Sequence, residues 1–154
     1  MSECLLEVKE LCTYFHTEAG EVRAVNGVSF SLEAGKILGI VGESGSGKSV
    51  TAYSIMQILA ENGRIASGEV LYKGQDVTKF NKSQLKGFRG KVCSIIFQDP
   101  MTSLNPVFTI GFQLEEAILL HTGKNKAQAR ERAIEMLTLV GVNQPDKRVK
   151  QYPH

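Results

Sequence analysis

The chain has 154 residues, a formal net charge of +2, no Trp and three Cys, with 42% hydrophobic and 22% charged residues. This is the composition of a soluble globular protein, which excludes a disordered or fibrous chain, and the length suits one domain with a sizeable core. No apolar run approaches the roughly 18 residues of a membrane-spanning helix, and the first residues do not resemble a secretory signal.

Charge and cysteine usage narrow the possible partners and the compartment. Residues 124–154 carry seven basic and three acidic residues, a net +4. This excess is too weak and too mixed to indicate a phosphate-backbone surface, so we expect no nucleic-acid partner. Cys4, Cys12 and Cys93 are odd in number, lack C-x-x-C spacing and lie in apolar runs. We expect buried free thiols in a reducing cytosol.

The first half of the chain predicts a small antiparallel sheet. Segments 5–11 and 22–32 alternate apolar and polar residues, as half-buried strands do, and 68–73 is a third such segment. The polar stretch between the first two contains the turn-permissive Gly20, so we expect a hairpin there.

Two further segments read as buried parallel strands. Residues 36–41 and 92–97 are nearly continuous apolar runs, the pattern of strands covered on both faces. A helix is expected after Gly47, and its apolar residues through Leu59 lie most of the way round, so it should be largely buried.

Beyond Pro106 the apolar period becomes helical. One stripe is expected from Ile110, Leu114, Ala117 and Ile118, and a second from Ala133, Ile134, Leu137 and Val140. Asn125 and Gln128 have the spacing of a capping pair that starts the second helix, and Gly141 is placed to end it.

Residues 42–49, which we call the phosphate loop, have the sequence Gly42-Glu43-Ser44-Gly45-Ser46-Gly47-Lys48-Ser49. This satisfies G-x-x-x-x-G-K-[ST], a pattern that lets successive backbone N–H groups point at phosphate oxygens in front of a helix. We expect the loop to bind the phosphates of a nucleotide, with Lys48 on the outer phosphates and the Ser49 hydroxyl on Mg²⁺; the pattern alone fits kinases, GTPases, helicases and transporter ATPases. A dinucleotide fingerprint is excluded because Val50 occupies its third glycine position.

The residues that precede the phosphate loop indicate which class of phosphate-loop protein this chain resembles. The stretch 24–30, then 35–41 leading into the phosphate loop, resembles the start of ABC transporter nucleotide-binding domains. That resemblance implies an α/β fold: a P-loop NTPase core with an amino-terminal antiparallel β-subdomain and a carboxy-terminal helical segment. The implied boundaries are 4–35 and 65–75 for the β-subdomain, 36–60 and 91–98 for the core, and 106–154 for the helical subdomain.

Residues 94–106, Ser-Ile-Ile-Phe-Gln-Asp-Pro-Met-Thr-Ser-Leu-Asn-Pro, resemble the Q-loop of the same family, in the form typical of oligopeptide, dipeptide and nickel importers. The resemblance implies that Gln98 reaches Mg²⁺ and the attacking water, and that the residues after it face a transmembrane permease subunit. It also places an adenine-stacking aromatic at Phe15, with Tyr14 as the alternative.

Several family motifs do not occur in these 154 residues. Members usually continue after a Tyr-Pro-His such as 152–154 with Leu-Ser-Gly-Gly, an apolar strand ending in Asp-Glu, and a switch histidine. We therefore expect the amino-terminal part of a longer ATPase, which binds ATP but alone hydrolyses it poorly. The parent would pair with a second ATPase subunit and sit on the inner face of the membrane through permease partners. The alternatives are a complete small phosphate-loop kinase or NTPase, and a cytosolic ABC module without transport.

Overall fold

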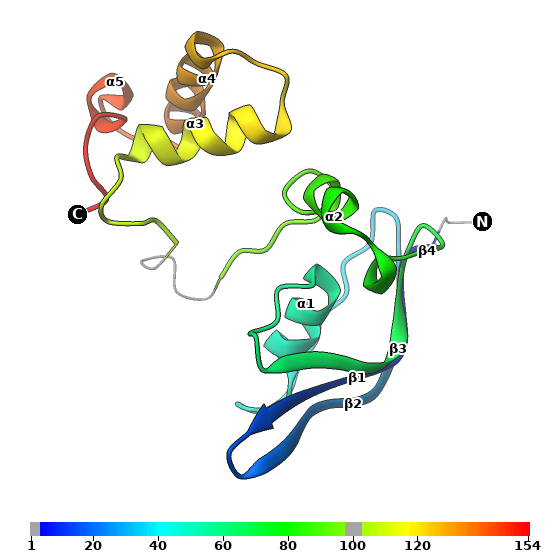
Figure 1. Ribbon diagram of the computed structural model, residues 1–154. Coiled ribbons are helices and arrows are strands. Elements are labelled where there is room, and N and C mark those ends of the chain that lie inside the picture. Colours follow the sequence, from blue (N-terminus) through cyan, green and yellow to red (C-terminus); the bar gives the residue numbers. More distant parts are fainter. Residues whose placement is uncertain (1–3, 98–102) are drawn as a thin grey trace. The chain divides into compact units, whose positions relative to one another are not determined.

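Figure 1 shows the computed structural model of the chain, which describes residues 4–97 and 103–154. It divides into two compact units, one ending at Cys93 and one beginning at Ser94. The first unit contains the sheet and the phosphate loop, and the second contains three helices.

The first unit is built on a four-stranded antiparallel sheet with the strand order β2-β1-β3-β4. β1 (Cys4–Thr17) and β2 (Gly20–Glu33) form the expected hairpin, and β3 (Gly63–Tyr72) pairs with the other edge of β1. The short β4 (Gln75–Asp76) closes the sheet. The prediction of a small antiparallel sheet is confirmed, although the strands run longer than their alternating segments because hairpin pairing continues to the turn.

One face of the sheet is covered by short helices (Figure 1). α1 (Lys48–Met56) contacts it through a buried hydrogen bond of 2.7 Å between the hydroxyls of Thr13 and Ser54. The 3-10 turn η1 (Val77–Lys79) and α2 (Lys82–Phe88) follow β4. α2 was not predicted from apolar period, but Asn81 and Gln84 form a capping box at its start.

A small apolar core joins these elements. Its members are fully or almost fully buried and come from β1, β3, η1, α1 and α2: Val8, Leu11, Val70, Val77, Met56 and Phe88. α1 ends earlier than its apolar pattern suggested, because Gln57 adopts a left-handed conformation with φ 56°. The side chain of Arg89 then donates hydrogen bonds to the carbonyls of Met56 and Gln57, which completes this helix end.

The expectation of two buried parallel strands is wrong for this structure. Within the described residues, neither 36–41 nor 92–97 forms a strand, apart from one isolated bridge between Arg89 and Cys93. Ile37 is 98% exposed, Val41 92% and Ile96 96%. A strand requires partners for its backbone N–H and C=O groups, and no strand among the described residues pairs with these segments.

The second unit consists of α3 (Ile110–His121), α4 (Lys126–Leu139) and the one-turn α5 (Pro145–Arg148). Asn125 and Gln128 form the expected capping box, and Gly141 has the positive φ of 76° expected at a helix end. The predicted stripes are wrong at Ala117 and Val140, which are exposed. The buried small residues are instead Gly111, Ala129 and Ala133, which let the elements of this unit approach closely.

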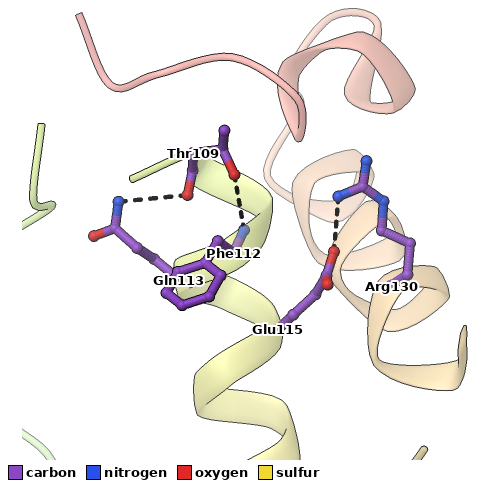
Figure 2. Close-up of polar contacts among 5 residues, drawn as sticks. All are labelled: Thr109, Phe112, Gln113, Glu115 and Arg130. Atoms are coloured by element: carbon purple, nitrogen blue, oxygen red, sulfur yellow. Dashed lines mark hydrogen bonds and ion pairs between the residues drawn. The ribbon is translucent and has the colours of Figure 1, made fainter. Parts of the chain in front are cut away.

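Polar contacts fix the start of α3, as Figure 2 shows. The Thr109 hydroxyl accepts a hydrogen bond from the Phe112 N–H at 3.2 Å, and Glu115 pairs with Arg130 of α4 at 2.7 Å. The N–H groups of Ile110 and Gly111 donate to carbonyls of residues 151 and 149, so the first turn of α3 is tied to the end of the chain.

The exposed apolar segment 36–41 generates a prediction about association. Because it offers apolar side chains and unpaired backbone groups, the 154-residue chain is expected to self-associate in sedimentation velocity. Replacing both Ile37 and Val41 by Lys should raise the monomer fraction. The matched control replaces Leu139 and Val140, which are also exposed but lie at a helix end; a wild-type chain that stays monomeric at all concentrations would contradict the expectation.

Candidate nucleotide-binding site

The phosphate loop has the curled backbone that its glycines permit. Gly45 and Gly47 have φ values of 82° and 88°, in the left-handed region that glycine enters without steric cost. A Cβ added at Gly42 would lie 2.6 Å from the Oγ of Ser46, and one added at Gly47 would overlap the carbonyl oxygen of Ala24. The loop is therefore tightly curled and closely seated on β2. A larger residue at 47 would not fit, whereas one at 42 would require the Ser46 hydroxyl to move.

The seat on β2 is a β-bulge. Thr13 pairs with Val25 whereas the next residue, Tyr14, pairs with Arg23, which leaves Ala24 as an extra residue without a partner on β1. A bulge bends its strand and redirects the backbone groups of the extra residue. Here it brings the Ala24 carbonyl against Gly47, at the junction of the phosphate loop and α1.

Lys48 is the first residue of α1, and its ammonium group lies over the phosphate loop. Its Nζ donates to the carbonyl oxygens of Gly42 at 2.7 Å and Glu43 at 2.6 Å, and to Ser46 Oγ at 3.3 Å. The first turn of α1 contains no acidic residue, so nothing there opposes the positive end of the helix dipole. A cation, a helix N-terminus and a glycine-rich loop meet at one place, a donor set that suits an anion such as a phosphate chain.

Ser44, Ser46 and Ser49 are exposed around this cation, so their hydroxyls are accessible to a ligand. Ser49 belongs to the first turn of α1, next to Lys48. Its hydroxyl oxygen is of the ligand type that Mg²⁺ prefers. Among residues 4–97 and 103–154, no cluster of three or more His, Cys, Asp or Glu side chains is arranged to hold a metal ion.

Phe15 and Tyr14 lie on opposite faces of β1, because successive side chains of a strand alternate. Pairing of β1 with β3 is regular from Thr13 to Phe15, so Phe15 shares the face on which Thr13 contacts α1. Tyr14, on the other face, donates to Asn26 Oδ1 at 3.4 Å and stacks under the guanidinium of Arg23 at 5.3 Å. The α1 side of the sheet therefore carries Phe15, and Tyr14 is engaged elsewhere.

Val22 was missed by the sequence reasoning. It is the direct cross-strand partner of Phe15 and is 51% exposed. Directly opposed side chains in an antiparallel pair lie on the same face, so Val22 extends the apolar surface beside the Phe15 ring. The pairing across the hairpin could have identified it, because the turn at residues 18–19 sets Phe15 opposite Val22.

Gln98 lies outside the described residues, so its predicted contact with Mg²⁺ and water stays a prediction. The segment that follows is described from Ser103, and α3 holds it through a side chain that the sequence reasoning did not single out. Gln113 accepts a hydrogen bond from the Asn105 N–H at 2.8 Å and donates to the carbonyls of Asn105, at 3.0 Å, and Phe108, at 3.1 Å. The loop before α3 is thus a defined structure.

The cysteines are only partly as expected. All three are free thiols, but Cys4 is exposed and Cys93 half-buried, and only Cys12 is buried. A hydrogen bond with Ser67, followed by one from the Gly27 N–H, lowers the pKa of the Cys12 thiol, whereas burial raises the pKa of Cys93. Cys4 is the first residue of β1, where it pairs with Glu33, the last residue of β2.

Comparison with known proteins decides the family. Residues 25–154 match the family model described as ABC transporter. The chain belongs to the ABC transporter family. This membership excludes the small kinase considered from the sequence. No helix in the described ranges is long and apolar enough to cross a membrane.

The curated relatives of this ABC transporter chain include peptide transport proteins. The oligopeptide transport ATP-binding protein OppD of Bacillus subtilis is 48% identical over 97% of this chain and 42% of its own length. The dipeptide transport ATP-binding protein DppD of the same organism is 47% identical over 99% of this chain and 46% of its own length. The chain thus spans less than half the length of these relatives.

Solved structures show the same ABC cassette fold. The dimeric structure of MJ0796, a bacterial ABC transporter cassette, matches with a TM-score of 0.78 at 20% identity. The match covers 97% of this chain and 62% of the MJ0796 chain. A post-hydrolysis structure of MJ0796 bound to ADP and Pi has a TM-score of 0.76 at 19% identity. The predicted fold class, an α/β P-loop NTPase, is confirmed.

For this ABC transporter chain, Lys48→Ala is expected to weaken Mg-ATP binding by about 2 to 3 kcal/mol, the scale of a hydrogen bond to a charged group. The affinity is measured by titration calorimetry, with circular dichroism to verify folding. Lys86→Ala, which removes the same charge from the exposed side of α2, is the control. Equal affinities of Lys48→Ala and wild type would remove Lys48 from the site.

Proposed function

We propose that this chain binds Mg-ATP and that, in its parent protein, it forms the nucleotide-binding part of an ATPase that drives peptide import. The observation that carries the proposal is the phosphate loop, curled at Gly45 and Gly47 and seated in front of α1 with the Lys48 ammonium over it. Peptide import is inferred from OppD and DppD, an oligopeptide and a dipeptide transport ATP-binding protein that each match nearly the whole chain.

Each predicted residue has a role in this proposal. Backbone N–H groups of residues 42–47 surround the phosphates, Lys48 neutralises the outer ones, and the Ser49 hydroxyl binds Mg²⁺. ATP supplies the phosphoanhydride bond whose cleavage drives the transporter. Gln98 orients Mg²⁺ and water, as the family resemblance implies. The left-handed Gly45 and Gly47, and the backbone contact that leaves no room for a Cβ at Gly47, support this assignment of the loop.

Adenine is assigned to the α1 side of the sheet, where Phe15 and Val22 offer an apolar surface. The buried contact between Thr13 and Ser54 fixes this part of β1 to the helix that starts at the phosphate loop. A base gains from stacking on an aromatic ring, and a triphosphate held by the loop leaves its base within the same unit. Tyr14 is the weaker candidate, because its ring lies on the other face under Arg23.

Phe15→Ala is expected to weaken Mg-ATP binding by about 1 to 3 kcal/mol, the scale of one stack between a base and an aromatic ring. Tyr14→Ala should change the affinity by much less, because Tyr14 contacts Arg23 and Asn26 on the opposite face. Both affinities are compared by calorimetry. A larger loss for Tyr14→Ala than for Phe15→Ala would move the adenine position to the other side of β1.

The proposed assembly contains a second ATPase subunit and transmembrane permease subunits. The dimeric MJ0796 cassettes, which share the fold, support the first partner. Permease contacts would place the protein on the inner face of the cell membrane. We assign 4–35 and 65–75 to a β-subdomain, 36–60 and 91–98 to the core, and 106–154 to a helical subdomain that faces the permease.

The surface after Gln98 supports this assignment. Val107, Phe108 and Phe112 are exposed, and the two aromatic rings stack with centroids 5.0 Å apart. Gln113 donates hydrogen bonds to the carbonyls of Asn105 and Phe108, which hold the loop before α3 in a defined conformation. A preformed, exposed aromatic pair is the kind of feature that anchors a protein interface.

Phe112→Asp should therefore weaken association with peptide-transporter permease subunits, measured as the fraction of chain that sediments with membranes from co-expressing cells. Mg-ATP affinity should be unchanged, because Phe112 is not part of the phosphate loop. Leu139→Asp, at another exposed apolar position of the same unit, is the control. Equal effects of the two variants would argue against this surface. If the same fraction of chain sediments with membranes that contain the permease and membranes that lack it, the result would favour a cytosolic ABC module without transport.

A further inference from the structure

We propose that Asn62 and Gly63 are positioning residues that hold the Phe15 ring where it stacks on adenine. The inference rests on the proposed function, because it assumes that Phe15 meets the base. Asn62 ends the connection between α1 and β3, and Gly63 is the first residue of β3; the sequence reasoning singled out neither. They act on Phe15 from the neighbouring strand, Gly63 through its missing side chain and Asn62 through hydrogen bonds.

Gly63 is the cross-strand partner of Phe15, and the ring occupies the space that a side chain at 63 would need. A Cβ added at Gly63 would lie 2.6 Å from Cε1 of Phe15, 3.0 Å from Cδ1 and 3.2 Å from Cζ. Non-bonded contacts of a Cβ atom are essentially never shorter than 3.0 Å, so the ring would have to move. One side of the half-buried ring thus rests on the Gly63 backbone, and its exposed remainder is left for a base.

The backbone at Gly63 does not itself require glycine. Its φ lies outside the positive region, in contrast to Gly68 of the same strand, which has φ 94°. Alanine could therefore adopt the same conformation at 63, and the substitution would act on the ring alone. This makes Gly63→Ala a specific probe of where the Phe15 ring lies.

Asn62 fixes the backbone directly after Phe15. The His16 N–H donates to the Asn62 carbonyl at 2.8 Å, and the Asn62 side-chain amide donates to the His16 carbonyl at 3.0 Å. The Gly63 N–H in turn donates to the Ala60 carbonyl at 2.8 Å, which closes the turn that leads into β3. Both the strand that carries the ring and the glycine beneath it are thereby held.

This connection also joins the ring to the phosphate side of the site. Only residues 57–62 separate the end of α1 from Gly63, and α1 begins at Lys48. Thr13, two residues before Phe15, is hydrogen-bonded to Ser54 of the same helix. The distance between a phosphate chain at the loop and a base at Phe15 is thus set by one short, hydrogen-bonded segment.

The test compares two ligands, Mg-ATP and Mg-tripolyphosphate, by calorimetry on the 154-residue chain. Gly63→Ala should weaken Mg-ATP about tenfold or more, the scale of a lost stack, and leave tripolyphosphate affinity unchanged. In a Phe15→Ala background, Gly63→Ala should have no further effect, because no ring remains to be moved. Gly87→Ala is the control, since a Cβ there meets nothing within 4 Å.

Asn62→Asp provides a second variant that does not crowd the ring. It keeps the shape of the side chain but cannot donate to the His16 carbonyl, so it should also weaken ATP more than tripolyphosphate. The inference would be overturned if both Gly63→Ala and Asn62→Asp bind ATP like wild type. It would also be overturned if these variants weaken ATP and tripolyphosphate equally, or if Gly63→Ala keeps its full effect in the Phe15→Ala background. A wild-type chain that binds neither ligand would instead overturn the proposed function.

Discussion

The proposed nucleotide site depends on the buried hydrogen bond between Thr13 and Ser54. Both side chains are fully buried, and Ser54 Oγ already donates to the Val50 carbonyl at 2.7 Å. Since a hydroxyl has one proton, Thr13 must be the donor to Ser54. A buried hydroxyl that loses its partner costs the full desolvation of that group, so this contact strongly favours one placement of α1 on β1. The strand with Phe15 and the helix with Lys48 are thereby held in one frame.

Features with a local signal were predicted well from the sequence. The phosphate loop is one continuous pattern, and its left-handed Gly45 and Gly47 follow from local steric rules. The hairpin and the capping box at Asn125 are likewise set by residues close in sequence. The prediction that Phe15 stacks on adenine rests on the family resemblance and stays a prediction, because an aromatic residue in a half-buried strand has no local feature that separates a base-stacking ring from a core ring.

Features that depend on distant partners were predicted poorly. Segments 36–41 and 92–97 have the composition of buried strands, but a strand exists only where another backbone pairs with it. Ala117 and Val140 fit a helical stripe, yet α3 and α4 meet through smaller residues, Gly111 and Ala133. The contact between Gly63 and Phe15 joins residues 48 positions apart, and no periodicity reveals it.

The bulge at Ala24 limits where the hairpin can gain or lose residues during evolution. The side-chain period of a strand is two, so deleting one residue of β2 between the turn and Val25 would remove the bulge, and the Ala24 carbonyl would no longer meet Gly47. Residues inserted at the turn, 18–19, would leave the pairing of Phe15 with Val22 intact. We therefore expect related chains to vary in length at the hairpin tip, while the number of residues from Val22 to Val25 stays constant.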